Sequence, residues 1–450
     1  MKPVRDDNEA VQSQIEALLA ESDLTAASLL VGDFHPSDLA DIVERLEDRY
    51  RVSFLLALPT EIAGETLAEM EHGEDRGDLL AALTTEKGAK LLEDLADDDA
   101  ADLIGELEPP EQKKLLDALT DETAGDLIGL LQYDAESAGG LMTLDLVAVE
   151  GSVSAATALE QVRFQGREVE DFYTVFVVDG SRRLLGTLRL DDLVIAEPSS
   201  SIDSLVTEPI ATVHPHDDQE EVSRLISRYN LAAIPVVSPD GHLLGRITFD
   251  DVIDVLEAEQ TEDILRFAGI ADEEELRHNW VESVRTRLPW LVLNLVTASL
   301  AAVVILVYED VIQQVITLAF LAPIIAALGG SSGTQSLAIT IRRLTIEGPG
   351  GARGFVLKEI LIGLVIGGVL GVGIAVLAVI VDGNPMLGLV VMLAMWGNQV
   401  VAGFAGAFVP ATLDRIGVDP SVASSVFVHT LTDLCGFFLL LGLASKLLLN

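Results

Sequence analysis

Asp433 is the residue whose type and setting point most directly to chemistry. It is the one charged residue in segment 420–445, and Thr430 and His429 precede it by three and four residues. On a helix these three side chains share one face. A carboxylate near mid-membrane costs about 2.5–3.5 kcal/mol on insertion scales, so it normally faces water or a partner. We therefore expect Asp433 to meet a cation on a watery path; the alternative is a hydrogen bond to a neighbouring helix backbone.

Polar residues also occur inside two other apolar segments. In segment 311–341, Pro323 is followed by the run Gly-Gly-Ser-Ser-Gly-Thr-Gln at 329–335. This run predicts a broken helix, because irregular backbone is tolerated in a membrane only where it lines a cavity. Asn398 and Gln399 lie in the middle of segment 383–413. Polar residues from three segments thus favour an internal path for ions.

The elements that must position these residues are long apolar helices. Four segments have no charge at all and the fifth contains only Asp433: 288–307, 311–341, 360–381, 383–413 and 420–445. Each is long enough for a hydrocarbon core that needs about 20 residues. The sequence therefore predicts an all-α transmembrane domain of five helices. Gly363, Gly367 and Gly371 recur every four residues in the third segment, which predicts a face for close helix packing.

The charge of the chain is divided unevenly. The 450 residues include 28 Lys and Arg against 72 Asp and Glu, yet the mean hydropathy is +0.40. Segment 281–450 has a net charge of −1, which leaves −43 on segment 1–280. A nucleic-acid partner is excluded, because phosphate contacts need a Lys and Arg surface. Cationic partners are favoured for the acidic part, although salt adaptation of the surface would also produce this surplus.

The short loops predict the orientation in the membrane. No signal peptide is visible in residues 1–10. With the N-terminus in the cytoplasm, seven of the eight basic residues of segment 281–450 fall inside, and only Lys446 falls outside. This satisfies the positive-inside rule. We expect a multi-pass protein of the plasma membrane with cytoplasmic N-terminal domains and the C-terminus outside.

Two internal repeats organise the acidic part. Residues 100–107 recur as 124–131, and helical spacing of Leu and Ala indicates stacked short helices from about residue 10 to 135. A second repeat relates segment 185–192 to segment 244–251, and each copy is predicted to run strand, helix, strand, Gly turn, strand, helix. The second repeat resembles a tandem pair of CBS modules.

The CBS resemblance has a specific motif. Segment 245–251 follows the pattern G-x-[IV]-[ST]-x-x-D, whereas Arg189 replaces the hydroxyl residue in the first copy. The resemblance implies that ATP or another adenine nucleotide binds the CBS pair, with Thr248 and Asp251 as ribose contacts. Packing within the module is the alternative role for these two residues.

The order of these parts resembles the MgtE family of magnesium channels and transporters over essentially the whole length. The resemblance is carried by segment 255–264, by Pro323 with the run 329–336, and by Gly417-Val418-Asp419-Pro420 leading to Thr430-Leu431-Thr432-Asp433. It implies a multidomain fold with a superhelical α-helical N domain, an α/β CBS pair and the five-helix domain. The implied boundaries are 1–137, 138–200 and 201–253 for the N domain and two CBS modules, 254–280 for a connecting helix, and 281–450 for the pore.

The resemblance also implies function and sites. It describes a homodimeric transporter, not an enzyme, which conducts Mg²⁺ and is gated by cytoplasmic Mg²⁺. Asp433 would hold a hydrated Mg²⁺, consistent with the reluctance of this ion to lose water. The other implied pore residues are Thr430, Ser331 and Ser425. The resemblance implies a plug formed by Glu257, Glu259, Glu262 and Asp263, with Asp419. From the acidic surplus we expect a Mg²⁺ sensor as well, with Asp251, Asp94 and Asp98 as candidate carboxylates.

The chain departs from the usual family sequence at three positions and lacks two enzyme motifs, and both observations bear on alternative functions. Ser331, Ser425 and His429 stand where the family usually has other residues, and imidazole favours transition metals. A transporter of Mn²⁺, Co²⁺ or Ni²⁺ with the same fold is therefore one alternative, and a CBS-regulated sensor without transport is another. No Gly-Lys-[Ser/Thr] or His-Glu-x-x-His occurs, which argues against an ATP-driven pump and a metalloprotease.

Overall fold

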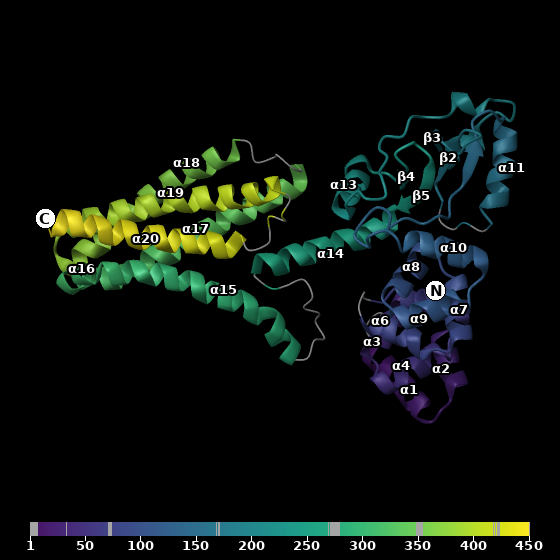
Figure 1. Ribbon diagram of the computed structural model, residues 1–450, viewed down its shortest axis with the longest axis horizontal. Helices are drawn as coiled ribbons and strands as arrows, with labels where there is room; N and C mark the ends of the chain where they lie inside the picture. Colours follow the sequence, from purple (N-terminus) through teal and green to yellow (C-terminus); the bar gives the residue numbers. More distant parts are fainter. Residues whose placement is uncertain are drawn as a thin grey trace. The chain divides into compact units, whose positions relative to one another are not determined.

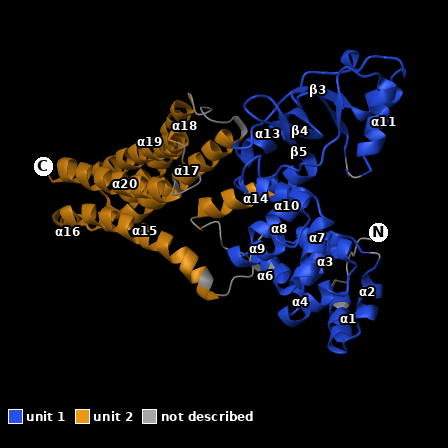
Figure 2. Ribbon diagram, turned by 45° about the vertical axis from the view of Figure 1, so that its right-hand side comes forward, with its two compact units in different colours: residues 1–256 blue, residues 257–450 orange. Residues whose placement is uncertain are grey.

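A computed structural model describes residues 8–32, 34–70, 74–167, 169, 172–268, 270, 280–347, 354–416, 418, 420 and 424–449 (Figure 1). The chain forms two compact units, Met1–Leu256 and Glu257–Asn450 (Figure 2).

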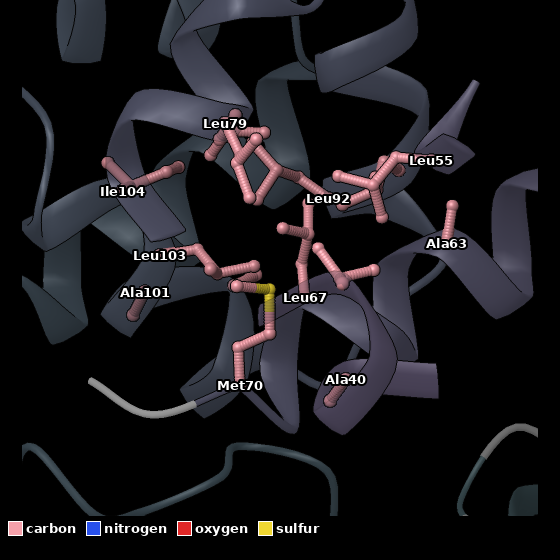
Figure 3. Packing of buried hydrophobic residues seen from close by; sticks show 14 of the residues in the cluster. Ala40, Leu55, Ala63, Leu67, Met70, Leu79, Leu92, Ala101, Leu103 and Ile104 are labelled. Carbon is pink, nitrogen blue, oxygen red and sulfur yellow. The ribbon is translucent and has the colours of Figure 1, made fainter. Parts of the chain in front are cut away.

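Short helices make up the N-terminal part of the first unit. They are α1 Asn8–Ala20, α2 Leu24–Val31, α3 Pro36–Arg45, α4 Asp48–Leu55, α5 Thr60–Ala68, α6 Glu74–Ala82, α7 Thr85–Glu93, α8 Asp97–Gly105, α9 Pro109–Leu116 and α10 Asp121–Leu130. Alternate helices pack together, α3 on α5 and α8 on α10. The repeat of 24 residues is therefore a helix pair, and its equivalent positions Leu103 and Leu127 are both fully buried. Figure 3 shows part of this core, including Leu67, Leu92 and Leu103.

The second repeat forms the α/β pair. The first copy contains β1 Ala148–Glu150, α11 Ala155–Gln165, β2 Thr174–Val178, β3 Leu184–Arg189 and α12 Leu190–Ile195. β1 pairs in parallel with β2, and β2 pairs antiparallel with β3. After the 3-10 turn η1 (Ile202–Ser204), the second copy contains α13 Gln219–Tyr229, the antiparallel strands β4 Ala233–Val237 and β5 Leu243–Thr248, and the start of α14.

The first strand expected in the second copy is reduced to one bridge. Val213 pairs in parallel with Val236, and the pairing does not extend to the neighbouring residues. Pro215 lacks an N–H, and the N–H of His214 is taken by the Asp217 carboxylate at 2.7 Å, so the ladder cannot extend. The two copies instead exchange their leading segments. Thr143 of the first copy bridges to Arg246 in β5, and Thr207 of the second bridges to Thr187 in β3.

The helix α14 (Phe249–Ala268) crosses the boundary between the units at Leu256. The second unit continues with α15 Trp280–Val307, α16 Glu309–Gln314, α17 Thr317–Glu347, α18 Phe355–Asp382, α19 Pro385–Arg415 and α20 Ser424–Leu448. Five helices in the described part of the chain, all of these except α14 and α16, are long and apolar enough to cross a membrane. This confirms the expected all-α domain. The most buried is α19, which packs against α17, α18 and α20 (Figure 1).

One expectation for the membrane helices is wrong and another is confirmed. α17 is continuous from Thr317 to Glu347, so Pro323 and the run 329–335 do not break it. The glycines serve close packing instead: a Cβ on Gly333 would lie 2.5 Å from the Val428 side chain of α20. In α18, Gly363, Gly367 and Gly371 are buried against α19, as their spacing predicts.

Candidate ion-binding cavity

A cavity between α17 and α20 contains the residue singled out first. Its volume is about 520 Å³, and it is lined by Ala326, Ala327, Gly330, Ser331, Thr334, His429 and Asp433. The lining residues of α17 follow helical spacing, so the uninterrupted helix is what brings them to one face. Asp433, His429 and the hydroxyl residues Ser331 and Thr334 therefore line one common space.

The structure separates the four predicted pore residues into two groups. Asp433 and Ser331 line the cavity. Thr430 and Ser425 lie on α20, as Asp433 does, but they are not among the lining residues. The Thr430 hydroxyl donates to the Val426 carbonyl at 2.7 Å. Thr334 lines the cavity although it was not a predicted ligand. It lies three residues after Ser331, so a continuous helix in place of the expected break would have indicated it.

His429 has a defined orientation in this cavity. Its Nδ1 lies 2.8 Å from the backbone carbonyl oxygen of Ser425. A carbonyl only accepts, so Nδ1 carries the hydrogen and Nε2 of the neutral ring bears the lone pair. A Cβ on Gly330 would lie 3.0 Å from Cδ2 and 3.2 Å from Nε2 of this ring. The glycine therefore leaves the room that the imidazole edge occupies.

Asn398 and Gln399 attach α19 to the cavity helix α17. Both are fully buried, and their amide groups donate to the carbonyls of Ile325 and Leu328, each at 3.1 Å. Their side-chain oxygens have no hydrogen-bond partner within the described part of the chain. Ile325 and Leu328 are direct chain neighbours of the lining residues Ala326 and Ala327, so the amides position the part of α17 that lines the cavity.

A second group of carboxylates lies in the first unit, at the start of α8. Burial, and then the nearby Asp145 and Asp126, raise the pKa of Asp97 from 3.8 to about 6. Burial, Asp99 and Asp251 raise the pKa of Asp98 well above its usual range. Asp98 Oδ1 is buried and has no hydrogen-bond partner in the described residues. The structure therefore brings the predicted sensor residues Asp98 and Asp251 near one another, in surroundings that favour a proton or a cation.

The remaining predicted sites are placed as follows. Asp94 is exposed at the end of α7. Asp251 Oδ2 accepts hydrogen bonds from Thr248, from its hydroxyl at 2.6 Å and its N–H at 3.2 Å, so both residues cap the start of α14. On α14, Glu262 pairs with Arg266. Glu257, Glu259 and Asp263 belong to the same helix, whereas Asp419 lies outside the described residues.

No complete metal cage made of side chains is present in the described ranges. No three His, Cys, Asp or Glu side chains there are grouped so that they could hold a metal ion. The cavity of α17 and α20 offers one carboxylate and one imidazole, so water or further groups would complete the coordination of any ion bound there.

Comparisons with known proteins agree with this arrangement. Sequence models of three families match the chain: "MgtE intracellular N domain" at residues 34–136, "CBS domain" at 202–258 and "Divalent cation transporter" at 322–443. A protein of Thermus thermophilus called "Magnesium transporter MgtE" is 33% identical over 447 residues, which cover 98% of this chain and 99% of that protein. The chain belongs to the MgtE family. An Enterococcus faecalis MgtE is 36% identical over 70% of each chain.

Solved structures extend the likeness to the fold of the first unit. The soluble part of a magnesium transporter is 29% identical and covers 56% of this chain and 99% of its own, with a TM-score of 0.51. The cytosolic domain of the Mg²⁺ channel MgtE, solved with ATP, is 32% identical over 54% of this chain and 99% of its own, also at 0.51. The multidomain fold expected from the sequence is thereby confirmed. The protein is a multi-pass membrane protein of a transporter family.

Proposed function

We propose that this MgtE-family chain transports Mg²⁺ across the plasma membrane through the cavity between α17 and α20. The observation that carries the proposal is Asp433, a carboxylate on a helix of the membrane type, facing a cavity lined by the hydroxyl residues Ser331 and Thr334. Relatives of matching length are magnesium transporters by name. No step of an enzymatic reaction is assigned to the chain.

The size of the cavity suits a hydrated ion. Mg²⁺ prefers six oxygen ligands and keeps several waters. Six waters occupy about 180 Å³ at about 30 Å³ each, well below the cavity volume of about 520 Å³. Asp433 can therefore attract the ion while its waters contact the hydroxyls of Ser331 and Thr334. Such outer-shell binding is weak enough to release the ion again, as conduction requires.

The test is Mg²⁺ uptake into proteoliposomes containing the full chain. Asp433→Asn keeps the shape of the side chain but removes its charge, and we expect uptake to fall to the background of empty vesicles. Asp310→Asn is the matched control, because this carboxylate lies in α16 and does not line the cavity. Undiminished uptake by Asp433→Asn would remove the carboxylate from the mechanism. Absence of uptake by the wild-type chain would favour the alternative of a membrane sensor without transport.

We also propose that the acidic first unit senses cytoplasmic Mg²⁺. The buried and unpartnered Asp98 Oδ1 lies in an electrostatic group with Asp251, where a bound cation would relieve the repulsion. Asp94 is a further sensor candidate at the neighbouring helix end. Salt adaptation accounts for the many exposed carboxylates outside this group. Sensing thus needs only a few of the 72 acidic residues.

In this proposal α14 transmits the signal as a plug through Glu257, Glu259, Glu262 and Asp263, and Asp419, outside the described residues, contributes a further carboxylate. Its support is that Phe267 at the end of α14 packs against a cluster formed by Leu337, Ile341, Ala405 and Val428. Protease cleavage of the full chain at the connecting segment should slow as Mg²⁺ rises, and Asp98→Asn should weaken this protection. Equal cleavage at all Mg²⁺ concentrations would contradict the sensor.

Three finer features complete the proposal. A homodimer would bring two copies of Asp433 toward one axis; crosslinking in vesicles tests it. Cytoplasmic N-terminal domains and an outer C-terminus follow from the loop charges, and labelling of a cysteine introduced at Asn450 on a Cys435→Ser background tests them.

ATP binding at the CBS pair is supported by the ATP-bound relative. Thr248→Val should weaken ATP binding if the residue contacts ribose and should leave it unchanged if the hydroxyl only caps α14.

The five-part division at residues 137, 200, 253 and 280 remains part of the proposal. Its connecting segment, 254–280, begins inside α14, and its pore domain begins at residue 281, one residue after the start of α15.

Transport of Mn²⁺, Co²⁺ or Ni²⁺ is the second candidate function, and the observation that favours it is the imidazole of His429 in the cavity.

A further inference from the structure

We propose that His429 Nε2 and the Asp433 carboxylate form a two-ligand site that binds imidazole-preferring divalent ions such as Ni²⁺ and Co²⁺ by direct coordination. Such an ion would occupy the cavity in place of hydrated Mg²⁺ and block its passage. The inference deepens the proposed function and rests on it, because the block is a property of the same ion path.

The first step is the state of the imidazole. The hydrogen bond from Nδ1 to the Ser425 carbonyl, at 2.8 Å, fixes the tautomer with its lone pair on Nε2. Metal-binding histidines commonly have this arrangement, in which the second nitrogen donates to a carbonyl or carboxylate and orients the ring. The acceptor here is a backbone atom of the preceding turn, so the orientation is built into α20 itself.

The second step is the placement of the two ligands. His429 and Asp433 are four residues apart on α20, and both line the cavity. Side chains with this spacing lie about 5–6 Å apart at Cβ, and a single ion can be held between such neighbours. The lack of a side chain on Gly330 of the facing helix α17 leaves room for the Cδ2–Nε2 edge of the ring, 3.0 and 3.2 Å from where a Cβ would lie. Ser331 and Thr334 are placed to contact the waters that complete the coordination.

The third step is the choice of ion. Mg²⁺ binds oxygen ligands and gives up water reluctantly, so the imidazole adds little to its binding. Affinity for nitrogen ligands rises from Mn²⁺ through Co²⁺ to Ni²⁺. The single cysteine, Cys435, is two residues from Asp433 and is not among the lining residues, so no thiolate takes part. The site is therefore expected to separate Ni²⁺ from Mn²⁺ by its one nitrogen ligand.

The experiment measures the block of Mg²⁺ uptake into proteoliposomes by Ni²⁺ and by Mn²⁺, each relative to the uptake of the same variant without competitor. For the wild type we expect half-block at a much lower concentration of Ni²⁺ than of Mn²⁺. In His429→Gln the Ni²⁺ concentration should rise by at least the roughly 10–100-fold that loss of an outer-shell partner costs, with little change for Mn²⁺. His242→Gln, in the turn before β5 of the first unit, is the matched control. If the ratio of the half-blocking Ni²⁺ concentration to the half-blocking Mn²⁺ concentration is the same in His429→Gln as in the wild type, the inference is overturned.

A measurement without transport covers a variant that no longer conducts. The visible absorption of Co²⁺ added to the purified full chain, with excess Mg²⁺ to occupy carboxylate sites, should lose intensity in His429→Gln but not in His242→Gln. Identical spectra for wild type and His429→Gln would also overturn the inference. The proposed function fails on a different result, which is undiminished Mg²⁺ uptake by Asp433→Asn.

Discussion

Gly329 of α17 and Asn398 of α19 are packed so closely that a Cβ on Gly329 would overlap the Asn398 amide nitrogen. That nitrogen donates to the Ile325 carbonyl, one turn earlier on α17. Gly329 precedes the cavity residues Gly330 and Ser331. The close approach therefore couples the position of the cavity wall to a buried amide that is not itself in the wall.

Gly329→Ala is accordingly expected to destabilise the membrane unit. Inserting a methyl group into a well-packed site typically costs about 1–3 kcal/mol, and here it also displaces a buried hydrogen-bonded amide. The thermal midpoint of the full chain in detergent, followed by size-exclusion fluorescence, should fall clearly. Gly368→Ala is the control, because a Cβ there meets nothing within 4 Å; an equal fall in both variants would contradict the packing argument.

The pattern of the sequence predicts most of the elements of this fold. Apolar length predicts the five long helices, and the repeat with an offset of 24 residues predicts stacked short helices. In the structure one repeat is a helix pair, and the equivalent positions Leu103 and Leu127 are buried. The exchange of Thr143 and Thr207 between the two β repeats is not visible in the same way. It depends on which strand edge each leading segment reaches, and such long-range pairing is independent of local residue pattern.

The residues of the cavity could be predicted only in part from the sequence. Asp433 is evident because a charge in an apolar segment needs a reason. Thr334 was not identified, because the expectation of a broken helix removed the regular spacing that places it beside Ser331. Glycines have two uses, irregular backbone and close approach. Only the neighbouring helices, with Asn398, Val428 and His429 against the glycines of α17, decide between them.

Thr334 offers a direct test of the cavity wall. Thr334→Val keeps the shape of this lining side chain and removes its hydroxyl. Loss of one hydrogen bond to a water of the ion, about 0.5–1.5 kcal/mol, should reduce Mg²⁺ uptake a few-fold below saturation. Thr345→Val on the same helix is the control, because the Thr345 hydroxyl donates to the Ile341 carbonyl and is not part of the lining. If both variants match the wild type, the hydroxyl has no part in binding the ion.

Arg76 and Glu106 form the buried ion pair of the helical repeat. Arg76 is 2% exposed, and its Nη2 and Nε donate to Glu106 at 2.7 and 3.0 Å, while Nη1 donates to the Ala68 carbonyl. Arg76→Met removes the guanidinium that faces Glu106, and breaking a buried pair in this way costs about 3–5 kcal/mol. Hydrogen exchange of α6 and α8 in the full chain should accelerate strongly.

The controls for Arg76 separate the buried charge from the loss of a side chain. Arg76→Met combined with Glu106→Gln should recover part of the protection, since the second change removes the carboxylate charge that faced Arg76. Arg49→Met breaks an exposed pair with Glu47, where about 1 kcal/mol or less is expected. Similar exchange rates in Arg76→Met and the wild type would show that the pair contributes little to the stability of the repeat.

The carboxylates at the start of α8 predict how stability depends on pH. The pKa of Asp97 is about 6 in the folded chain against an ordinary 3.8, so between pH 4 and 6 the folded state binds more protons than the unfolded state. Stability must then rise as the pH falls through 6 toward 4, because buried repulsion is relieved. Raised pKa values of Asp98 and Asp251 act in the same direction.

In the absence of divalent ions, α8 of the wild type should become better protected from hydrogen exchange, after correction for intrinsic rates, when the pH is lowered from 7.5 to 5. Asp97→Asn should be better protected at pH 7.5 and should respond less to pH, whereas Asp78→Asn, at an exposed carboxylate of α6, should behave like the wild type. A wild-type α8 that loses protection over this range would contradict the raised pKa of Asp97.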